Sequence, residues 1–171
     1  CVSVFLVTEV ARRLTLNKSE PTPVDGMPEL YTYLRNLLPP SAPFFYLSAS
    51  PYNLYPLLRD FRDKYFPYGQ LILRDTSWTT VSGLLETLTV GTETFKVNRI
   101  KKIRQWFPRR KIICIGDSTQ SDPEAYGVIS RLFPGWIRLI LIRRVTGIAA
   151  AGLEEKNAPE RFERAFASLP R

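Results

Sequence analysis

KIICIGDSTQSDPE, residues 111–124, is the stretch that decides the fold. Residues 111–115 are apolar apart from Lys111, and such a short apolar run predicts a buried strand. A polar loop follows, and Pro123 then marks the first position of a helix, for which Asp122 is a suitable cap. A strand without polar alternation that leads directly into a helix is typical of a parallel sheet covered on both faces.

The same alternation of strand and helix extends outward in both directions. Further apolar runs predict strands, and stretches with an apolar period of 3.6 residues predict helices between them. One of these helices would be capped by Asn53. We therefore predict an α/β fold, a three-layer Rossmann-like parallel sheet with helices on both faces. The predicted strands are 1–8, 43–47, 71–73, 111–115 and 136–142, and the predicted helices begin near residues 27, 54, 95, 122 and 159.

Length and composition fit one globular domain covering residues 1–171. The chain is 44% hydrophobic, which excludes disordered and collagen-like proteins. Its apolar runs are shorter than the ~20 residues that cross a bilayer, so we expect a soluble domain. Residues 76–94, rich in Ser and Thr, are predicted to be an insertion. Because residue 1 is Cys and not Met, we expect the chain to be a fragment with further sequence upstream.

The charge balance favours an anionic partner. Lys and Arg number 24 against 16 Asp and Glu, a net charge of +8, which suits a phosphate group, an acidic lipid surface or a nucleic acid equally well. No stretch interleaves basic and aromatic residues, so no nucleic-acid partner is expected. The chain has no histidine, which excludes every mechanism based on Ser-His, Cys-His or His-bound metal.

Ligands of parallel sheets bind beyond the carboxyl ends of the strands, and the residues at those ends are therefore the candidates for a site. Asp117 and Asp122 could bind Mg²⁺ through carboxylate oxygens, or could cap the helix and stabilise the turn. Lys96, expected near a helix N-terminus, could bind an anion or be a solvated charge. The other candidates at strand ends are Ser48, Ser50, Arg74, Arg143 and Arg144.

Two kinds of basic residue have alternative interpretations. Arg74 could bind a phosphate through two parallel hydrogen bonds, or could pair with Asp60 or Asp75. The clusters 101–102 and 109–111 could contact anionic lipid headgroups or form solvated faces. Considered together, the strand-end residues are suited to holding a metal-bound phosphate.

Seven blocks of the sequence resemble the actin-patch phosphatidate phosphatases, a family of the haloacid-dehalogenase superfamily. The specific blocks are Ser48-Ala-Ser-Pro51 and Gly116-Asp-Ser118 followed by Asp122-Pro-Glu124. The resemblance follows the family's order along nearly the whole chain. The full blocks are Val24–Tyr31, Phe45–Leu54, Leu73–Asp75, Phe95–Ile100, Ile115–Tyr126, Ile140–Thr146 and Pro159–Phe166.

The resemblance implies a haloacid-dehalogenase-like sheet and Mg²⁺-dependent hydrolysis of phosphatidate to diacylglycerol through an aspartyl-phosphate. Ser48 would bind the phosphate, and Lys96 would neutralise charge on phosphate and nucleophile. Ser50 and Arg74, as residues at strand ends, are expected to be further substrate contacts. Asp117 and Asp122 would be the magnesium ligands. The expected partner is phosphatidate or another anionic lipid at a membrane surface, in the cytoplasm or at cortical actin patches.

The first motif of the family, Ser-Asp-x-Asp-Asp-Thr, is missing from this chain. If Ser3 and Thr8 align with that motif, Val4 takes the nucleophile position and Leu6 the acid/base position; otherwise both aspartates would lie upstream. No carboxylate precedes Glu9 in either case. Because Val cannot attack phosphorus and Leu cannot transfer a proton, we predict a truncated or degenerate phosphatase domain that is inactive or nearly so. The alternative is a pseudophosphatase that binds phosphate or anionic lipid without turnover.

Overall fold

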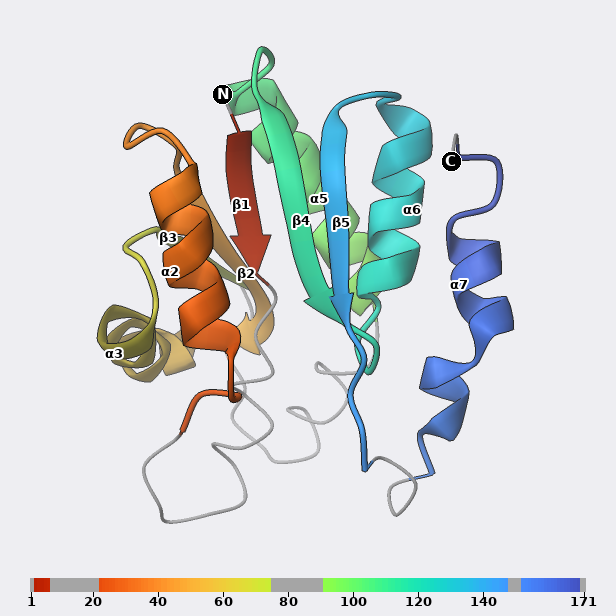
Figure 1. Cartoon of the computed structure of the whole chain (residues 1–171), viewed down its shortest axis with the longest axis horizontal. Coiled ribbons are helices and arrows are strands. Elements are labelled where there is room, and N and C mark those ends of the chain that lie inside the picture. The colour runs from red at the N-terminus through yellow and green to blue at the C-terminus, as the bar shows by residue number, and fades with distance from the viewer. Residues whose placement is uncertain (1, 7–21, 75–90, 148–151, 170–171) are drawn as a thin grey trace.

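The computed structural model describes residues 2–6, 22–74, 91–147 and 152–169, and for 2–6 it describes the backbone only. Five parallel strands form one sheet in the order β3-β2-β1-β4-β5 (Figure 1). The predicted α/β class and parallel sheet are confirmed. The expected strand over residues 1–8 is confirmed from Val2 to Leu6, where it pairs with both neighbours. The strands are β1 (Val2–Leu6), β2 (Phe44–Pro51), β3 (Gln70–Arg74), β4 (Lys111–Asp117) and β5 (Ile137–Arg143).

Helices connect the strands, and several of their starts differ from the predictions. Glycine at position 91 has φ +69°, and this left-handed turn begins a helix at Thr92, three residues earlier than predicted. Asn53 is not a cap, because it lies inside a short 3₁₀ helix, and the next helix begins at Tyr55 with Leu54 as its N-cap residue. Asp122 is also not a cap, because its side chain is turned into the protein. The helices are α2 (Met27–Leu37), η1 (Tyr52–Leu54), α3 (Tyr55–Tyr65), α5 (Thr92–Trp106), α6 (Asp122–Leu132), η3 (Glu154–Asn157) and α7 (Pro159–Ala165).

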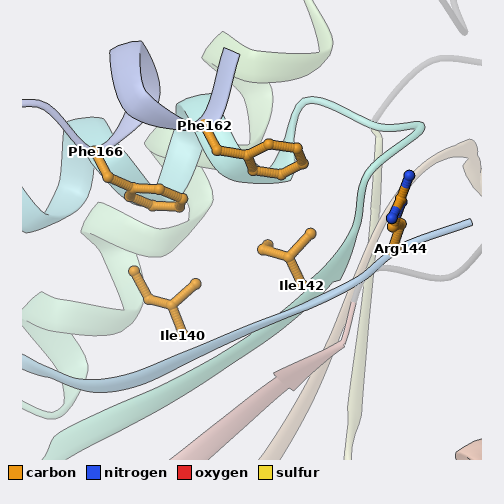
Figure 2. Close-up of a pocket in the computed structure, with 5 residues that line it drawn as sticks. All are labelled: Ile140, Ile142, Arg144, Phe162 and Phe166. Atoms are coloured by element: carbon orange, nitrogen blue, oxygen red, sulfur yellow. The ribbon is translucent and has the colours of Figure 1, made fainter. Parts of the chain in front are cut away.

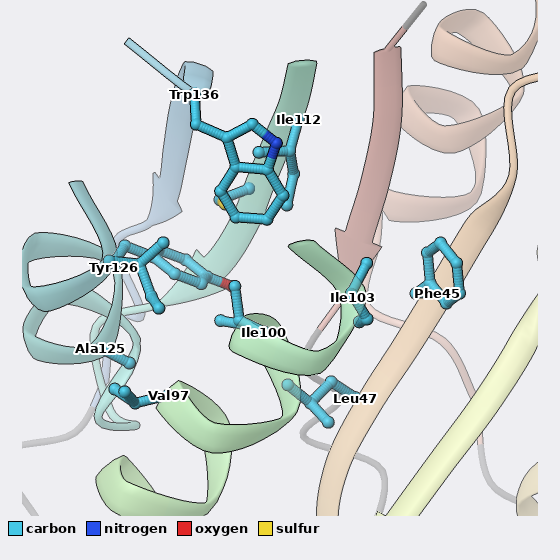
Figure 3. Close-up of a cluster of buried hydrophobic side chains, with 11 residues drawn as sticks. Phe45, Leu47, Val97, Ile100, Ile103, Ile112, Ala125, Tyr126 and Trp136 are labelled. Atoms are coloured by element: carbon cyan, nitrogen blue, oxygen red, sulfur yellow. The ribbon is translucent and has the colours of Figure 1, made fainter. Parts of the chain in front are cut away.

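Both faces of the sheet are covered, which explains the continuous apolar runs. Along β2 and β4, successive side chains enter opposite cores, so neither strand shows polar alternation. The larger core lies under α5 and α6 and is drawn in Figure 3. The smaller core lies under α2. The larger core includes Phe45, Leu47, Ile100, Ile112, Cys114 and Tyr126, and the smaller one includes Tyr31, Leu34, Phe44, Tyr46, Ile113 and Ile115.

Helix α7 packs against α6, and a glycine sets how closely. A Cβ on Gly127 would lie 1.9 Å from the carbonyl oxygen of Ala165, so any larger residue would push α7 away. Cys114 is a buried free thiol, and burial raises its pKa. Most of the predicted insertion lies outside the described residues, and Thr92–Thr94 form the first turn of α5. Among the described helices, none combines the length and apolar character of a membrane span.

Candidate functional site

Strand register brings Ser48 and Asp117 to one row at the carboxyl edge of the sheet. Leu6 in the central strand β1 pairs with Tyr46 on one side and with Ile115 on the other. Ser48 and Asp117 each follow those partners by two residues, so they flank the exit of β1 at the same level. Both side chains are buried. We call this edge of the sheet the rim.

A buried ion pair lies at the rim. The Lys96 ammonium is 2.7 Å from Oδ1 of Asp122, and both side chains are 0% exposed. Because α5 begins at Thr92, Lys96 lies in its second turn and points inward, and is neither solvated nor at the helix N-terminus. Burial raises the pKa of the Asp122 carboxyl, although Lys96 and the backbone N–H of Asp117 act to lower it.

Glycine at position 116 makes room for this pair. A Cβ there would lie 2.5 Å from both Cβ and Cγ of Asp122. The close approach lets the backbone N–H of Asp117 donate to Oδ2 of Asp122 at 3.0 Å. Asp122 therefore links the end of β4 to Lys96, because it accepts one hydrogen bond from the backbone of Asp117 and one from the Lys96 ammonium.

Asp117 holds the turn that follows β4. Its Oδ1 accepts hydrogen bonds from the N–H of Thr119 at 2.8 Å, the hydroxyl of Thr119 at 2.6 Å and the N–H of Gln120 at 3.0 Å. Within the described part of the chain, no donor contacts its Oδ2. Both oxygens of Asp122 are engaged by Lys96 and by Asp117, which argues against Asp122 as a metal ligand.

The described residues offer little to a fully protein-bound metal. No group of three His, Cys, Asp or Glu side chains in them is arranged to hold an ion. Mg²⁺ often retains several waters and binds through one or two carboxylates plus a substrate phosphate. Oδ2 of Asp117 fits that minimal role. The geometry favours Asp117 over Asp122 in this role, and the expected pair of aspartate ligands stays a prediction.

Ser48 and Ser50 form the other side of the rim, at the end of β2. The hydroxyl of Ser48 donates to that of Ser50 at 2.8 Å, and the N–H of Ser50 donates back to Ser48 Oγ at 3.2 Å. Both serines are buried. The Ser48 hydroxyl is therefore engaged both as a donor and as an acceptor, in each case with Ser50.

Arg74 ends β3 beside Pro51. Its guanidinium lies over the Phe95 ring, with Cζ 5.3 Å from the centroid, and burial lowers its pKa. The suggested pairing with Asp60 is not seen, because Asp60 pairs with Arg59 on the surface. The other suggested partner, Asp75, lies outside the described residues. Arg74 thus lies on the side of the rim that carries the hydroxyls of Ser48 and Ser50, which we call the hydroxyl side.

Register also locates the two positions proposed for the missing carboxylates. Leu6 lies one pleat repeat, two residues, before the row of Ser48 and Asp117. Val4 pairs with Phe44 and Ile113, four residues before that row, or about 13 Å along the strand. The backbone at position 4 therefore lies well before the rim.

The basic clusters do not join the site. Arg110, directly before β4, and Lys111, its first residue, bond to the carbonyls of Ser41 and Gly135 at the amino edge of the sheet. Lys101 and Lys102 lie on the outer part of α5. Arg110 and Lys111 are thus separated from the rim by the length of β4, and Lys101 and Lys102 lie more than one helical turn beyond Lys96 along α5.

Arg161 on α7 is a further residue of the site that no sequence pattern predicted. Its guanidinium pairs with both oxygens of Glu124, at 2.6 and 2.8 Å, and donates to the carbonyls of Ser118 and Gln120. A further bond goes to the carbonyl of Lys156. Arg161 therefore clamps the loop that carries Asp117 and Asp122. No local pattern marks it, because these loop carbonyls are 41 and 43 residues upstream.

Comparisons with known proteins agree with the sequence blocks. A family model described as "Phosphatidate phosphatase APP1, catalytic domain" matches residues 3–144. Phosphatidate phosphatase APP1 of Saccharomyces cerevisiae is 32% identical over 120 residues, which is 70% of this chain and 19% of the yeast protein. The matched part is thus about a fifth of that relative's length. No solved structure matches the chain significantly.

Proposed function

The chain belongs to the family of the phosphatidate phosphatase APP1 catalytic domain, and from this premise we propose that its rim binds the phosphate of phosphatidate. The strand order and the helices on both faces support a three-layer, haloacid-dehalogenase-like architecture for the domain. Ligands of such sheets bind at the carboxyl ends of the strands, which is where the rim lies.

The observation that carries the proposal is the buried ion pair of Lys96 and Asp122. A fully buried ammonium is costly unless it is paired, and this chain maintains one directly beside Asp117. An ammonium has three N–H donors, of which Asp122 takes one within the described residues. The others are suited to oxygens of a phosphate, whose charge Lys96 would neutralise.

The remaining rim residues complete the binding of the phosphate. The Ser48 hydroxyl would exchange its bond to Ser50 for one to a phosphate oxygen, and Arg74 would add positive charge on that side. Asp122 orients Lys96 and fixes the turn. Oδ2 of Asp117 would hold Mg²⁺, which when bound would neutralise charge on the phosphate.

We further propose that the chain as printed binds phosphate without hydrolysing it. The family reaction needs a carboxylate nucleophile and a carboxylate acid/base, and residues 1–8 contain neither Asp nor Glu. Ser48, Lys96 and Asp117 could stabilise charge, but they supply no attacking group for the covalent route. Because phosphatidate resides in membranes, the site would meet its ligand at a membrane surface, which a net charge of +8 favours.

Two measurements test these proposals. Isothermal titration calorimetry should detect binding of glycerol 3-phosphate in Mg²⁺ buffer, weakened at least tenfold by Lys96→Met through loss of a charged hydrogen-bond donor. Lys102→Met, on the exposed side of the same helix, should leave the affinity unchanged. Equal weakening by both variants would contradict the assigned site.

Turnover is measured separately, on phosphatidate and on a generic phosphomonoester with Mg²⁺ present. No phosphate release is expected. Robust release that Asp117→Asn abolishes would overturn the proposal of binding without hydrolysis, while leaving the location of the site intact.

A further inference from the structure

An open apolar groove runs between the edge strand β5 and helix α7. It measures about 420 Å³, within the range of small-molecule sites. Ile140 and Ile142 face it from the strand. Phe162 of α7 and Phe166, which directly follows α7, face it from the other side. Figure 2 shows the two phenyl rings opposite the two isoleucines, with a gap between them. All four side chains are only partly buried.

The groove has one charged end. Arg144 follows β5 on the same side as the isoleucines, two residues after Ile142, and is exposed. Its neighbour Arg143 pairs in register with Asp117, so this end of the groove opens beside the rim. From Arg144 back to Ile140 the strand covers about 13 Å. The groove thus runs away from the rim along a strip of apolar side chains.

We propose that this groove holds one acyl chain of the lipid whose phosphate occupies the rim. The inference deepens the proposed function and rests on it for the position of the headgroup. Arg144 is the one lining side chain that can make hydrogen bonds, which suits an alkyl chain with an anionic head and does not suit a peptide. Charge at the rim end and apolar walls beyond it match the polarity of such a lipid.

The affinity that an acyl chain would add in this groove can be estimated from its length. A methylene fully removed from water strengthens binding about fourfold, and in a half-open groove we expect roughly twofold for each. Octanoyl lysophosphatidate, used below its critical micelle concentration, should therefore bind at least tenfold more tightly than glycerol 3-phosphate. Isothermal titration calorimetry measures both affinities on the same protein.

Variants on the two faces of β5 provide a matched comparison. Ile142→Thr keeps a β-branched residue but makes the groove wall polar, and should remove most of the gain from the acyl chain. Leu139→Thr makes the same kind of change at a position of opposite parity on the same strand, and should preserve the gain. Phe162→Gln, on α7, is the second groove variant and does not depend on how β5 tolerates substitution. Circular dichroism and thermal unfolding verify that each variant is folded.

The outcomes separate the groove from the phosphate site. The proposal is supported if Ile142→Thr and Phe162→Gln lose the affinity that the octanoyl chain adds, while their affinity for glycerol 3-phosphate is unchanged. The groove is not the acyl-chain site if the octanoyl chain adds no affinity, or if Leu139→Thr reduces the added affinity as much as the groove variants do. Either result leaves the proposed phosphate site unaffected. Failure of the proposed function has a different signature, because glycerol 3-phosphate would then bind without dependence on Lys96.

Discussion

The two sides of the rim are built in different ways. On the side of β4 and α6, Lys96 and Arg161 reach in from other helices and bond to Asp122 and to the loop after Asp117. On the side of β2, Ser48 and Ser50 bond to each other. The charged side is thus held by partners distant in sequence, whereas the hydroxyl side depends on neighbours two residues apart.

This difference separates two contributions to ligand binding. The charged side is assembled by folding itself, so its groups are in place before a phosphate arrives, and disturbing them costs stability as well as affinity. The hydroxyl side must exchange a hydrogen bond when it binds, and disturbing it should affect affinity with little effect on stability. Each of the following predictions tests one part of this contrast.

The largest effect is expected at the buried ion pair. Lys96→Met and Asp122→Asn should each lower the free energy of unfolding by about 3–5 kcal/mol, because each leaves the partner buried without its counter-charge. The double variant should lose less than the sum of the two, since it removes both charges. Urea denaturation of the four proteins gives the coupling energy, and Lys102→Met is the control. Additive losses would show that the two groups do not stabilise each other.

The second effect concerns the clamp on the loop. Arg161→Lys keeps the positive charge but loses the bidentate contact with Glu124 and at least one carbonyl bond, for a loss of about 1.5–3 kcal/mol in unfolding free energy. Affinity for glycerol 3-phosphate should also fall, because the loop carrying Asp117 is less fixed. Arg164→Lys, on the exposed side of α7, is the matched control. A stability loss with unchanged affinity would assign Arg161 a purely structural role.

The positions of the strands and the parallel sheet could be predicted because buried parallel strands form uninterrupted apolar runs, as in residues 111–115. The same logic placed Ser48 and Asp117 at the carboxyl edge. The partnership of Lys96 with Asp122 could not be predicted, since it depends on the turn at Gly91 and on the space beside Gly116. These are properties of backbone geometry that side-chain patterns do not express.

Arg161 illustrates a second limit of sequence analysis. Its partners include carbonyl groups, which every residue carries, so no residue type upstream signals the contact. Asn53 shows the reverse case, in which a suitable capping residue is present but lies in a 3₁₀ helix, so that Leu54 takes the N-cap position of the helix that follows. Local signals identify elements well, whereas contacts between elements depend on the complete fold.

A smaller effect is expected on the hydroxyl side. Ser48→Ala should change the free energy of unfolding by about 1 kcal/mol, while affinity for glycerol 3-phosphate falls about tenfold. Ser50→Ala is the informative control, because it releases the Ser48 hydroxyl from its present acceptor and should leave affinity unchanged or raised. If Ser50→Ala weakens binding as much as Ser48→Ala, Ser50 is itself needed for binding, and the bond between the two serines is not simply exchanged for one to the phosphate.

The smallest effect distinguishes two parts of the Arg161 clamp. Burial raises the pKa of Glu124, but its hydrogen bond and charge interaction with Arg161 outweigh this and hold the pKa below its usual 4.5. A carboxyl whose pKa is depressed by folding stabilises the protein above its unfolded pKa and loses that contribution as pH falls through the folded value.

The stability difference between the wild type and Glu124→Gln should therefore be largest above about pH 5 and shrink below pH 4.5. Because the Glu124 side chain is 32% exposed, solvent screening limits the difference to about 1 kcal/mol or less. Urea denaturation across this pH range, with the exposed Glu163→Gln as control, measures it. A difference that does not change with pH would mean that Arg161 holds the loop through the carbonyls of Ser118 and Gln120 alone, so that the charged side of the rim owes its order to the backbone and not to the ion pair.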